Sequence, residues 1–466
     1  MEWKRVVKKS GLYLIGNLSS KILNALLLPI YAFYLSKDDL GYFDNSQTIM
    51  NVVVIVLYIA IWESILRFGL TEKNNIKKEK YITSAIIFCT CVSLGILFIS
   101  VFISILLKYP LLITIAFMSV FYALAQIWQY FARALFKNNE YVISGILGTI
   151  VNFLLIILLV CIFEKGFWGL IISYSLGRIS TLLYLEIKIK LLKKIKIKRF
   201  SFHILKKMIL YSAPLVLNLV SGWFISGFNR VVITKYLGVS ITGLYSFADK
   251  FSILITMLGS VITMAVIEET ILSRKNENLG ENFSKTIKIL FKLFLDLGII
   301  MVPFIGIFYN IIKNTEFYYS IYFCAFLILY AIFQTMASNI GSIFQAIDKT
   351  RYQFTTTLTG AFCTVVITFL MLNNCGIYAV LFGQVVGSLV MVFTRYILVN
   401  KFISFKLEWI KIVAKVVFFV VLYCMILNET KYFQIIVCII CIIYFIINYF
   451  YFIKKIYKYL KIKIKG

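Results

Sequence analysis

Acidic residues, prolines and histidines are scarce in this chain. Its 466 residues include four prolines and one histidine, His203, and 20 aspartates and glutamates stand against 48 lysines and arginines. The low proline content and the long unbroken apolar runs favour transmembrane helices over a β-barrel, which would alternate polar and apolar residues in short strands. The sequence shows no glycine-rich phosphate loop and no metal-ligand spacing. We therefore expect neither a catalytic centre nor a bound metal, and predict that the protein is not an enzyme.

Apolar residues dominate instead. They make up 61% of the chain, and the mean hydropathy is +0.92, whereas average proteins contain about 45–50% apolar residues. Since a helix needs about 20 apolar residues to cross a bilayer, the runs predict an all-α polytopic membrane protein with about fourteen transmembrane helices. The predicted spans are 11–35, 44–67, 81–107, 110–136, 141–163, 167–187, 208–237, 241–272, 284–312, 317–347, 352–373, 376–399, 408–428 and 431–453.

The net charge of +28 would suggest nucleic-acid binding in a soluble protein. Here the basic residues gather in the even-numbered connections between spans and in the C-terminal tail, while the odd-numbered connections carry about one each. The positive-inside rule then places both termini in the cytoplasm. We therefore predict a multi-pass protein of the bacterial cytoplasmic (inner) membrane that does not bind nucleic acid.

A weak internal repeat divides the spans. Glycines recur between the halves at a shift of about 200 residues: Gly41 recurs as Gly243, Gly166 as Gly376, and Gly177 as Gly387. Two lobes with the same topology would be related by an axis along the membrane normal. The predicted organisation is an N-terminal six-helix lobe (1–190), a basic cytoplasmic connection (191–207), a C-terminal six-helix lobe (208–400), and two additional transmembrane helices with a basic tail (401–466).

Polar residues inside the spans are the candidate functional residues, because burying them in hydrocarbon is costly unless they face protein or water. Four cations lie within spans: Lys21, Arg178, Arg230 and Lys250. If they line one cavity, they would bind an anionic cargo such as a pyrophosphate through charge-assisted hydrogen bonds. Structural ion pairs or snorkelling are the alternatives. The predicted polar lining of that cavity consists of Asn17, Asn24, Gln126, Gln129, Asn218, Asn229, Asp249 and Gln334, with interhelical hydrogen bonding as the alternative role.

Other charged residues in the spans are expected to form an ion pair or to reach the membrane surface. Glu63 and Arg67 are four residues apart and are expected to pair with each other. Three cations near span ends, Arg395, Lys415 and Lys235, are expected to snorkel to the lipid headgroups.

Two stretches carry a resemblance to a known family. The run GLYLIGNLSSKILNALLLPIYAFYLSKDDLG, from Gly11 to Gly41, resembles the opening of bacterial oligosaccharide flippases of the Wzx type. The run FNRVVITKYLGVSITGLYSFADKFS, from Phe228 to Ser252, is similar to the most recognisable stretch of that family. It belongs to the superfamily that also holds multidrug exporters and the lipid II flippase. The chain departs from the family by carrying Asn229 where members often have an acidic residue.

The resemblance implies two six-helix lobes that move a polyprenyl-pyrophosphate-linked oligosaccharide from the inner to the outer leaflet by alternating access, for surface polysaccharides such as O-antigen or capsule. It implies undecaprenyl-pyrophosphate-linked oligosaccharide and membrane lipids as partners, with a polysaccharide polymerase and a chain-length regulator as further candidates. No cofactor is expected, and coupling to an H⁺ or Na⁺ gradient stays open.

Two other function classes make different demands on the sequence. A multidrug or cation antiporter of the same fold would use buried carboxylates, for which Glu63, Asp249 and Asp296 are the candidates. A membrane polymerase would need a large outer loop for its chemistry, and the predicted topology leaves no room for one.

Overall fold

The computed structural model describes residues 23, 26–72, 74–108, 111–272, 279–347, 349–428 and 430–465. Within these ranges the secondary structure is helical and contains no strand. The chain divides into two compact units, Met1–Ser246 and Phe247–Gly466. The predicted fold class, an all-α polytopic membrane protein, is confirmed. The lobe boundaries inferred from the repeat stay a prediction.

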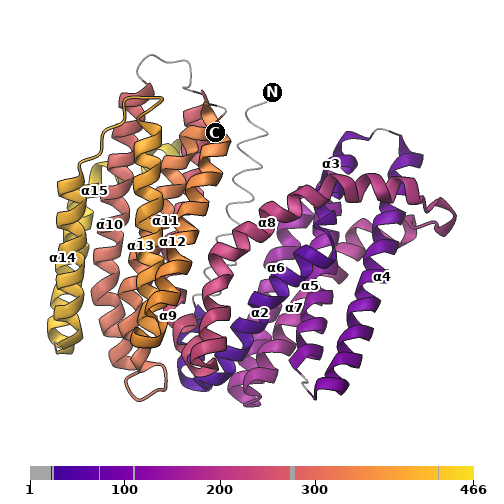
Figure 1. The fold of residues 1–466 in the computed structure, drawn as a ribbon, viewed down its shortest axis with the longest axis horizontal. Coiled ribbons are helices and arrows are strands. Elements are labelled where there is room, and N and C mark those ends of the chain that lie inside the picture. Colours follow the sequence, from indigo (N-terminus) through magenta and orange to yellow (C-terminus); the bar gives the residue numbers. More distant parts are fainter. Residues whose placement is uncertain are drawn as a thin grey trace. The chain divides into compact units, whose positions relative to one another are not determined.

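The first unit is a bundle of long helices (Figure 1). A helical segment over 26–34 precedes α2 (Lys37–Leu57), α3 (Ile61–Thr71), α4 (Asn75–Leu107), α5 (Leu111–Ala134), α6 (Asn138–Ile156) with a π-helical extension (Ile157–Ile162), α7 (Gly166–Ile189) and α8 (Phe202–Leu237). Helix α5 packs against α2, α3, α4, α6 and α7, so its polar residues are surrounded by protein on several sides. Helix α9 (Val239–Leu272) begins in this unit and continues into the next.

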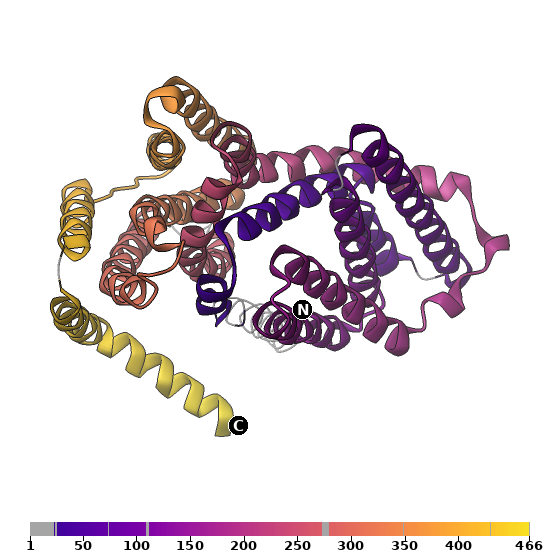
Figure 2. The same cartoon turned by 90° about the horizontal axis from the view of Figure 1, so that it is seen from below.

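The second unit contains α10 (Leu279–Ile311), α11 (Ile321–Ala346), α12 (Thr350–Cys375), α13 (Ile377–Val399), α14 (Trp409–Asn428) and α15 (Lys431–Lys465). Its interior includes a cluster of stacked and edge-to-face rings, Phe247, Phe251, Phe308, Tyr309 and Phe317. Helices α14 and α15, drawn in yellow in Figure 2, both pack against α10.

Twelve helices in the described ranges are long and apolar enough to cross a membrane. They correspond to the third to fourteenth predicted spans. The predicted second span, 44–67, is wrong as one continuous helix, because α2 and α3 are bent by 54° at a short break. Ile59 and Ala60 have φ angles of 51° and 45° in that break, a left-handed conformation that a β-branched residue rarely adopts. Most of the predicted first span lies outside the described residues.

Glycines allow the closest helix crossings in both units. A Cβ on Gly177 of α7 would lie 2.7 Å from the Gly148 carbonyl oxygen of α6, and a Cβ on Gly387 of α13 would lie 2.6 Å from the Gly360 carbonyl oxygen of α12. Real Cβ atoms do not approach so closely, so each crossing requires glycine. The same type of glycine crossing therefore joins α6 to α7 in the first unit and α12 to α13 in the second.

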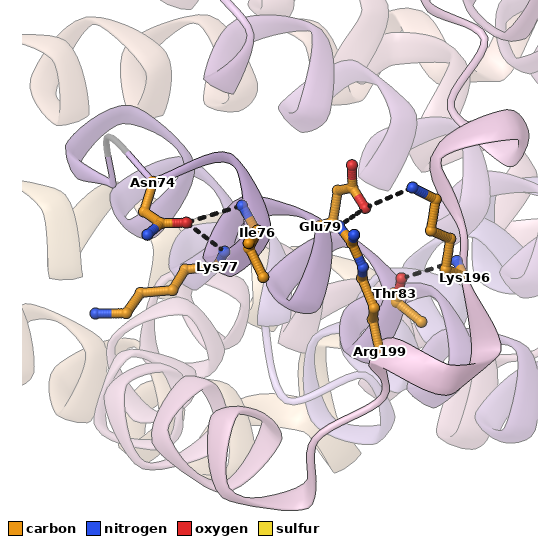
Figure 3. A network of polar contacts seen from close by, with 7 residues as sticks. All are labelled: Asn74, Ile76, Lys77, Glu79, Thr83, Lys196 and Arg199. Carbon is orange, nitrogen blue, oxygen red and sulfur yellow. Dashed lines mark hydrogen bonds and ion pairs between the residues drawn. The ribbon is translucent and has the colours of Figure 1, made fainter.

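The lysine-rich connection between α7 and α8 is held against the start of α4 (Figure 3). Glu79 forms ion pairs with Arg199 and with Lys196, the latter at 3.3 Å, and Thr83 accepts a hydrogen bond from the Lys196 backbone amide at 3.3 Å. Asn74 caps α4 by accepting hydrogen bonds from the Ile76 and Lys77 amides. Part of the positive charge of the connection is thus neutralised by the protein itself.

Candidate transport site

Arg178 lies in α7 among aromatic rings. Its Cζ atom is 5.0 Å from the ring centroids of both Tyr122 of α5 and Tyr174 of α7, and the Tyr174 ring meets Phe43 of α2 edge-on at 6.2 Å. Cation–π contacts compensate part of the cost of placing a guanidinium in a membrane span. Among the described residues no carboxylate pairs with Arg178. Its positive charge is therefore stabilised but not neutralised, as an anion-binding residue requires.

Unpartnered polar atoms accompany Arg178 in the same helices. The Gln126 Oε1 atom of α5, one turn from Tyr122, and the Asn152 Oδ1 atom of α6 are buried without a hydrogen-bond partner in the described structure. Asn152 packs against Gly177, beside Arg178. Buried polar atoms are nearly always hydrogen-bonded, so these oxygens are available to water or to the polar groups of a ligand. Gln129, further along α5, is half-buried next to Gly145.

Arg230 occupies a second polar region, formed by α8 and the start of α9. Its Cζ atom is 5.7 Å from the Tyr245 ring centroid. The preceding Asn229 is buried, and its Oδ1 atom has no hydrogen-bond partner among the described residues. Helix α8 is fixed to α2 by a 2.8 Å hydrogen bond from the Trp223 indole to the Thr48 carbonyl. Consecutive residues of a helix point about 100° apart, and Asn229 is buried whereas Arg230 is half-buried.

A buried acid of α2 was missed. Asp44 is buried in the first unit, although it stood at the predicted start of the second span and was not included among the candidate carboxylates. The neighbouring Asn45 Oδ1 and Ser46 Oγ atoms are buried without partners in the described structure. The sequence could have indicated this site, because three consecutive short polar residues, Asp44 to Ser46, beside an apolar run are unusual in a membrane helix.

In the second unit, several polar side chains of α9 and α11 form hydrogen bonds within their own helix. Asp249 accepts a hydrogen bond from Ser252, Ser260 donates to the Met257 carbonyl at 2.8 Å, and Ser338 donates to the Gln334 carbonyl at 3.0 Å. Hydroxyl groups that bond to the preceding turn are tolerated in apolar surroundings. Lys250 and Gln334 are half-buried.

Several predicted residues lie beyond what the structure describes. Asn17, Lys21 and Asn24 are outside the described residues, as is the side chain of Asn218. Arg178 and Arg230 belong to the first unit, whereas Lys250 and Asp249 belong to the second. A common cavity lined by all four cations therefore stays a prediction.

Two of the cations expected to snorkel are instead bound inside the protein. Arg395 of α13 is only 3% exposed. Its guanidinium donates to the Thr356 hydroxyl at 3.0 Å, to the Thr357 hydroxyl at 2.8 Å and to the Ala337 carbonyl. It thus joins α13 to α11 and α12, and the snorkelling prediction is wrong for this residue.

Lys415 of α14 forms an ion pair with Asp296 of α10, which is 1% exposed and also accepts a 2.9 Å hydrogen bond from the Tyr449 hydroxyl of α15. The snorkelling prediction is therefore wrong for Lys415 as well. Within the described chain, Glu63 accepts a 3.2 Å hydrogen bond from Tyr130 rather than pairing with Arg67. Arg67 lies 4.5 Å from the Tyr211 ring centroid.

A protein-family profile described as "Polysaccharide biosynthesis protein" matches residues 6–268, more than half of the chain. None of the curated protein sequences compared with the chain matches it.

Solved transporter structures share the fold. The lipid II flippase MurJ, in an inward closed conformation, is similar with a TM-score of 0.69 and 17% identity over 94% of this chain and 99% of the flippase. An inward-facing multidrug resistance transporter of the MATE family has a TM-score of 0.66 and 17% identity over 83% of this chain and 98% of its own. A Vibrio cholerae MATE transporter, as a point mutant, has a TM-score of 0.55 and 13% identity, with 85% and 96% covered.

Proposed function

The chain belongs to the polysaccharide biosynthesis protein family, and on that premise we propose that it is a flippase for lipid-linked oligosaccharide. It moves a polyprenyl-pyrophosphate-linked oligosaccharide from the inner to the outer leaflet of the bacterial cytoplasmic membrane by alternating access, for surface polysaccharide such as O-antigen or capsule. Both termini face the cytoplasm, and transport is coupled to an ion gradient of protons or sodium. A polysaccharide polymerase takes up the product in the outer leaflet, and a chain-length regulator acts with it.

The observation that carries this proposal is the positive charge of Arg178 inside a membrane span. The guanidinium lies against Tyr122 and Tyr174 and has no carboxylate partner among the described residues, so it retains a positive charge that could bind a pyrophosphate. Charge-assisted bidentate hydrogen bonds from arginine suit the oxygens of such a group. The sugar hydroxyls would replace water on buried oxygens such as that of Gln126. Arg230, beside Tyr245, is the second candidate contact in this unit.

Gene deletion with lipid extraction tests the proposal. Deleting the gene should cause undecaprenyl-pyrophosphate-linked repeat units to accumulate on the cytoplasmic face and surface polymer to be lost. Restoring the gene as Arg178→Gln should leave most of the accumulation. The matched control is Lys188→Gln, because Lys188 is an exposed residue of the same helix and its loss changes the net charge equally. Normal surface polymer after deletion, with no other transporter to substitute, would refute the proposal.

A multidrug or cation antiporter is the second candidate, because the MATE transporters share the fold. It requires a buried carboxylate that can exchange cations. Lys415 neutralises Asp296, and Tyr130 hydrogen-bonds Glu63, so Asp44 becomes a candidate alongside Asp249. Under this reading, overexpression should raise tolerance to several cationic dyes, and Asp44→Asn should abolish that effect while surface polymer stays normal.

A further inference from the structure

A groove lined by lysines runs between α10 and α14 in the second unit. Its volume is about 350 Å³, and its wall includes Lys288 and Lys292 from α10 and Lys411 and Lys415 from α14. One carboxylate, Glu408, also lines it. Neither the candidate transport residues nor the proposed function uses this groove.

The groove carries more positive than negative charge. Glu408 is shared between Lys288, at 3.1 Å, and Lys411, at 2.6 Å, and Lys415 is paired with the buried Asp296. Four ammonium groups thus face two carboxylates. Since neighbouring cations repel one another, this excess of positive charge favours binding of an anion from outside the chain.

Lys292 is the lysine whose partners are neutral. Its ammonium donates to the Asn448 Oδ1 atom of α15 at 3.0 Å and lies 5.6 Å from the Tyr449 ring centroid. An ammonium has three donors, so Lys292 retains hydrogen-bonding capacity for a further acceptor. The hydrogen bonds from Lys411 and Lys288 lower the pKa of the Glu408 carboxyl, as expected where cations are in excess.

The groove opens onto an apolar surface. Ile289 of α10, which lines the groove, is 59% exposed. Phe418 and Met425 of α14 are 54% and 47% exposed, and they lie seven and fourteen residues after Lys411, on the same side of a helix whose composition suits a membrane span. Lysines at the end of a span with exposed apolar side chains beyond them match the two parts of a phospholipid, a charged head and its acyl chains. Free phosphate would use only the first part.

We propose that this groove binds the phosphate headgroup of an anionic membrane lipid, with the acyl chains along the exposed apolar side of α14. Basic pockets between transmembrane helices are known to hold such headgroups. The lipid would join α10, α14 and α15, since Lys292 reaches the groove while bonded to α15.

Native mass spectrometry of the full chain, purified in detergent and titrated with phosphatidylglycerol or phosphatidylcholine, tests the site. The wild type should bind phosphatidylglycerol more tightly than phosphatidylcholine. The double variant Lys292→Gln/Lys411→Gln should weaken phosphatidylglycerol binding about tenfold, with phosphatidylcholine binding unchanged. Lys285→Gln/Lys406→Gln is the matched control, because both residues are exposed and outside the groove and the change in net charge is the same.

Glu408→Gln provides a test in the opposite direction. It removes the one carboxylate on the groove wall and should strengthen phosphatidylglycerol binding, which no loss of folding would imitate. Equal loss of binding in the groove variant and the control, or weaker binding in Glu408→Gln, would overturn the proposal. If inorganic phosphate at millimolar concentration displaced phosphatidylglycerol completely, the phosphate chemistry would hold but the assignment to a lipid would be overturned.

Discussion

The buried ion pair between Asp296 and Lys415 predicts an unequal response to removing its two partners. Asp296 is 1% exposed, whereas the Lys415 side chain is 25% exposed. Lys415→Met leaves a buried carboxylate whose remaining hydrogen-bond donor is the Tyr449 hydroxyl at 2.9 Å. Leaving a buried charge without its partner costs about 3–5 kcal/mol.

Asp296→Asn leaves a lysine that can turn its ammonium into the adjoining groove. The expected cost is about 1–2 kcal/mol, mainly from the weakened hydrogen bond with Tyr449. The double variant Asp296→Asn/Lys415→Met contains no unpaired charge at this position. It should therefore be more stable than the sum of the two single changes predicts, by roughly 2 kcal/mol or more.

Thermal unfolding of the purified protein in detergent, followed by size-exclusion chromatography after heating, measures these differences. A change of 1 kcal/mol shifts the melting temperature by about 2–4 °C in a unit of this size, so Lys415→Met should lower it by roughly 6–20 °C. Asp296→Asn should lower it by a few degrees. If Asp296→Asn were the more damaging single change, or if the double variant were additive, the assignment of the cost to an unpaired buried carboxylate would be refuted.

Three further substitutions and one control variant test other parts of the fold by the same assay. Arg395→Lys should cost about 1–3 kcal/mol, because one ammonium cannot reproduce a guanidinium that donates to two hydroxyls and a carbonyl on two helices. Gly243→Ala should destabilise the first unit by about 1–3 kcal/mol, because its Cβ would lie 1.8 Å from a carbonyl oxygen of α2, whereas Gly95→Ala meets nothing within 4 Å and should be neutral or stabilising. Glu186→Gln should cost about 1–2 kcal/mol, because the carboxylate accepts hydrogen bonds from the Trp128 indole and from two backbone amides that follow α7.

The membrane helices were predictable because each helix satisfies its backbone hydrogen bonds internally, so an apolar run alone predicts a span. The break between α2 and α3 was not. Residues 52–62 are almost continuously apolar, and nothing in composition distinguishes a straight helix from one that passes through left-handed residues at Ile59 and Ala60. Such a conformation is maintained by tertiary packing, which includes a 2.7 Å hydrogen bond between Tyr58 and Ser93 of α4.

The burial and the partners of the charged residues were less predictable than the helices. Arg395 and Lys415 lie near span ends, and position along a helix permits either snorkelling or burial. The outcome depends on residues distant in sequence: Thr356 is 39 positions from Arg395, and Asp296 is 119 positions from Lys415. One sequence contains no information on such pairings. Arg178 was identified because its mid-span position leaves fewer alternatives, although its aromatic neighbours were not foreseen.

The positions of glycines are more tightly constrained by the fold than the positions of charged residues, which is why glycines reveal a recurring pattern in the sequence. A charge can be satisfied by many partners, so its position is free to change. A crossing in which a carbonyl oxygen occupies the place of a Cβ admits only glycine. Gly41 and Gly243 recur in sequence, and in the first unit they also meet, since a Cβ on either would lie 3.0–3.2 Å from the backbone nitrogen of the other. Gly41, Gly243, Gly177 and Gly387 therefore mark backbone contacts between helices. The third repeated pair, Gly166 and Gly376, instead adopts positive φ angles of 46° and 53° where α7 and α13 begin. Substitutions at the contact glycines should destabilise the fold without a specific effect on which cargo is transported.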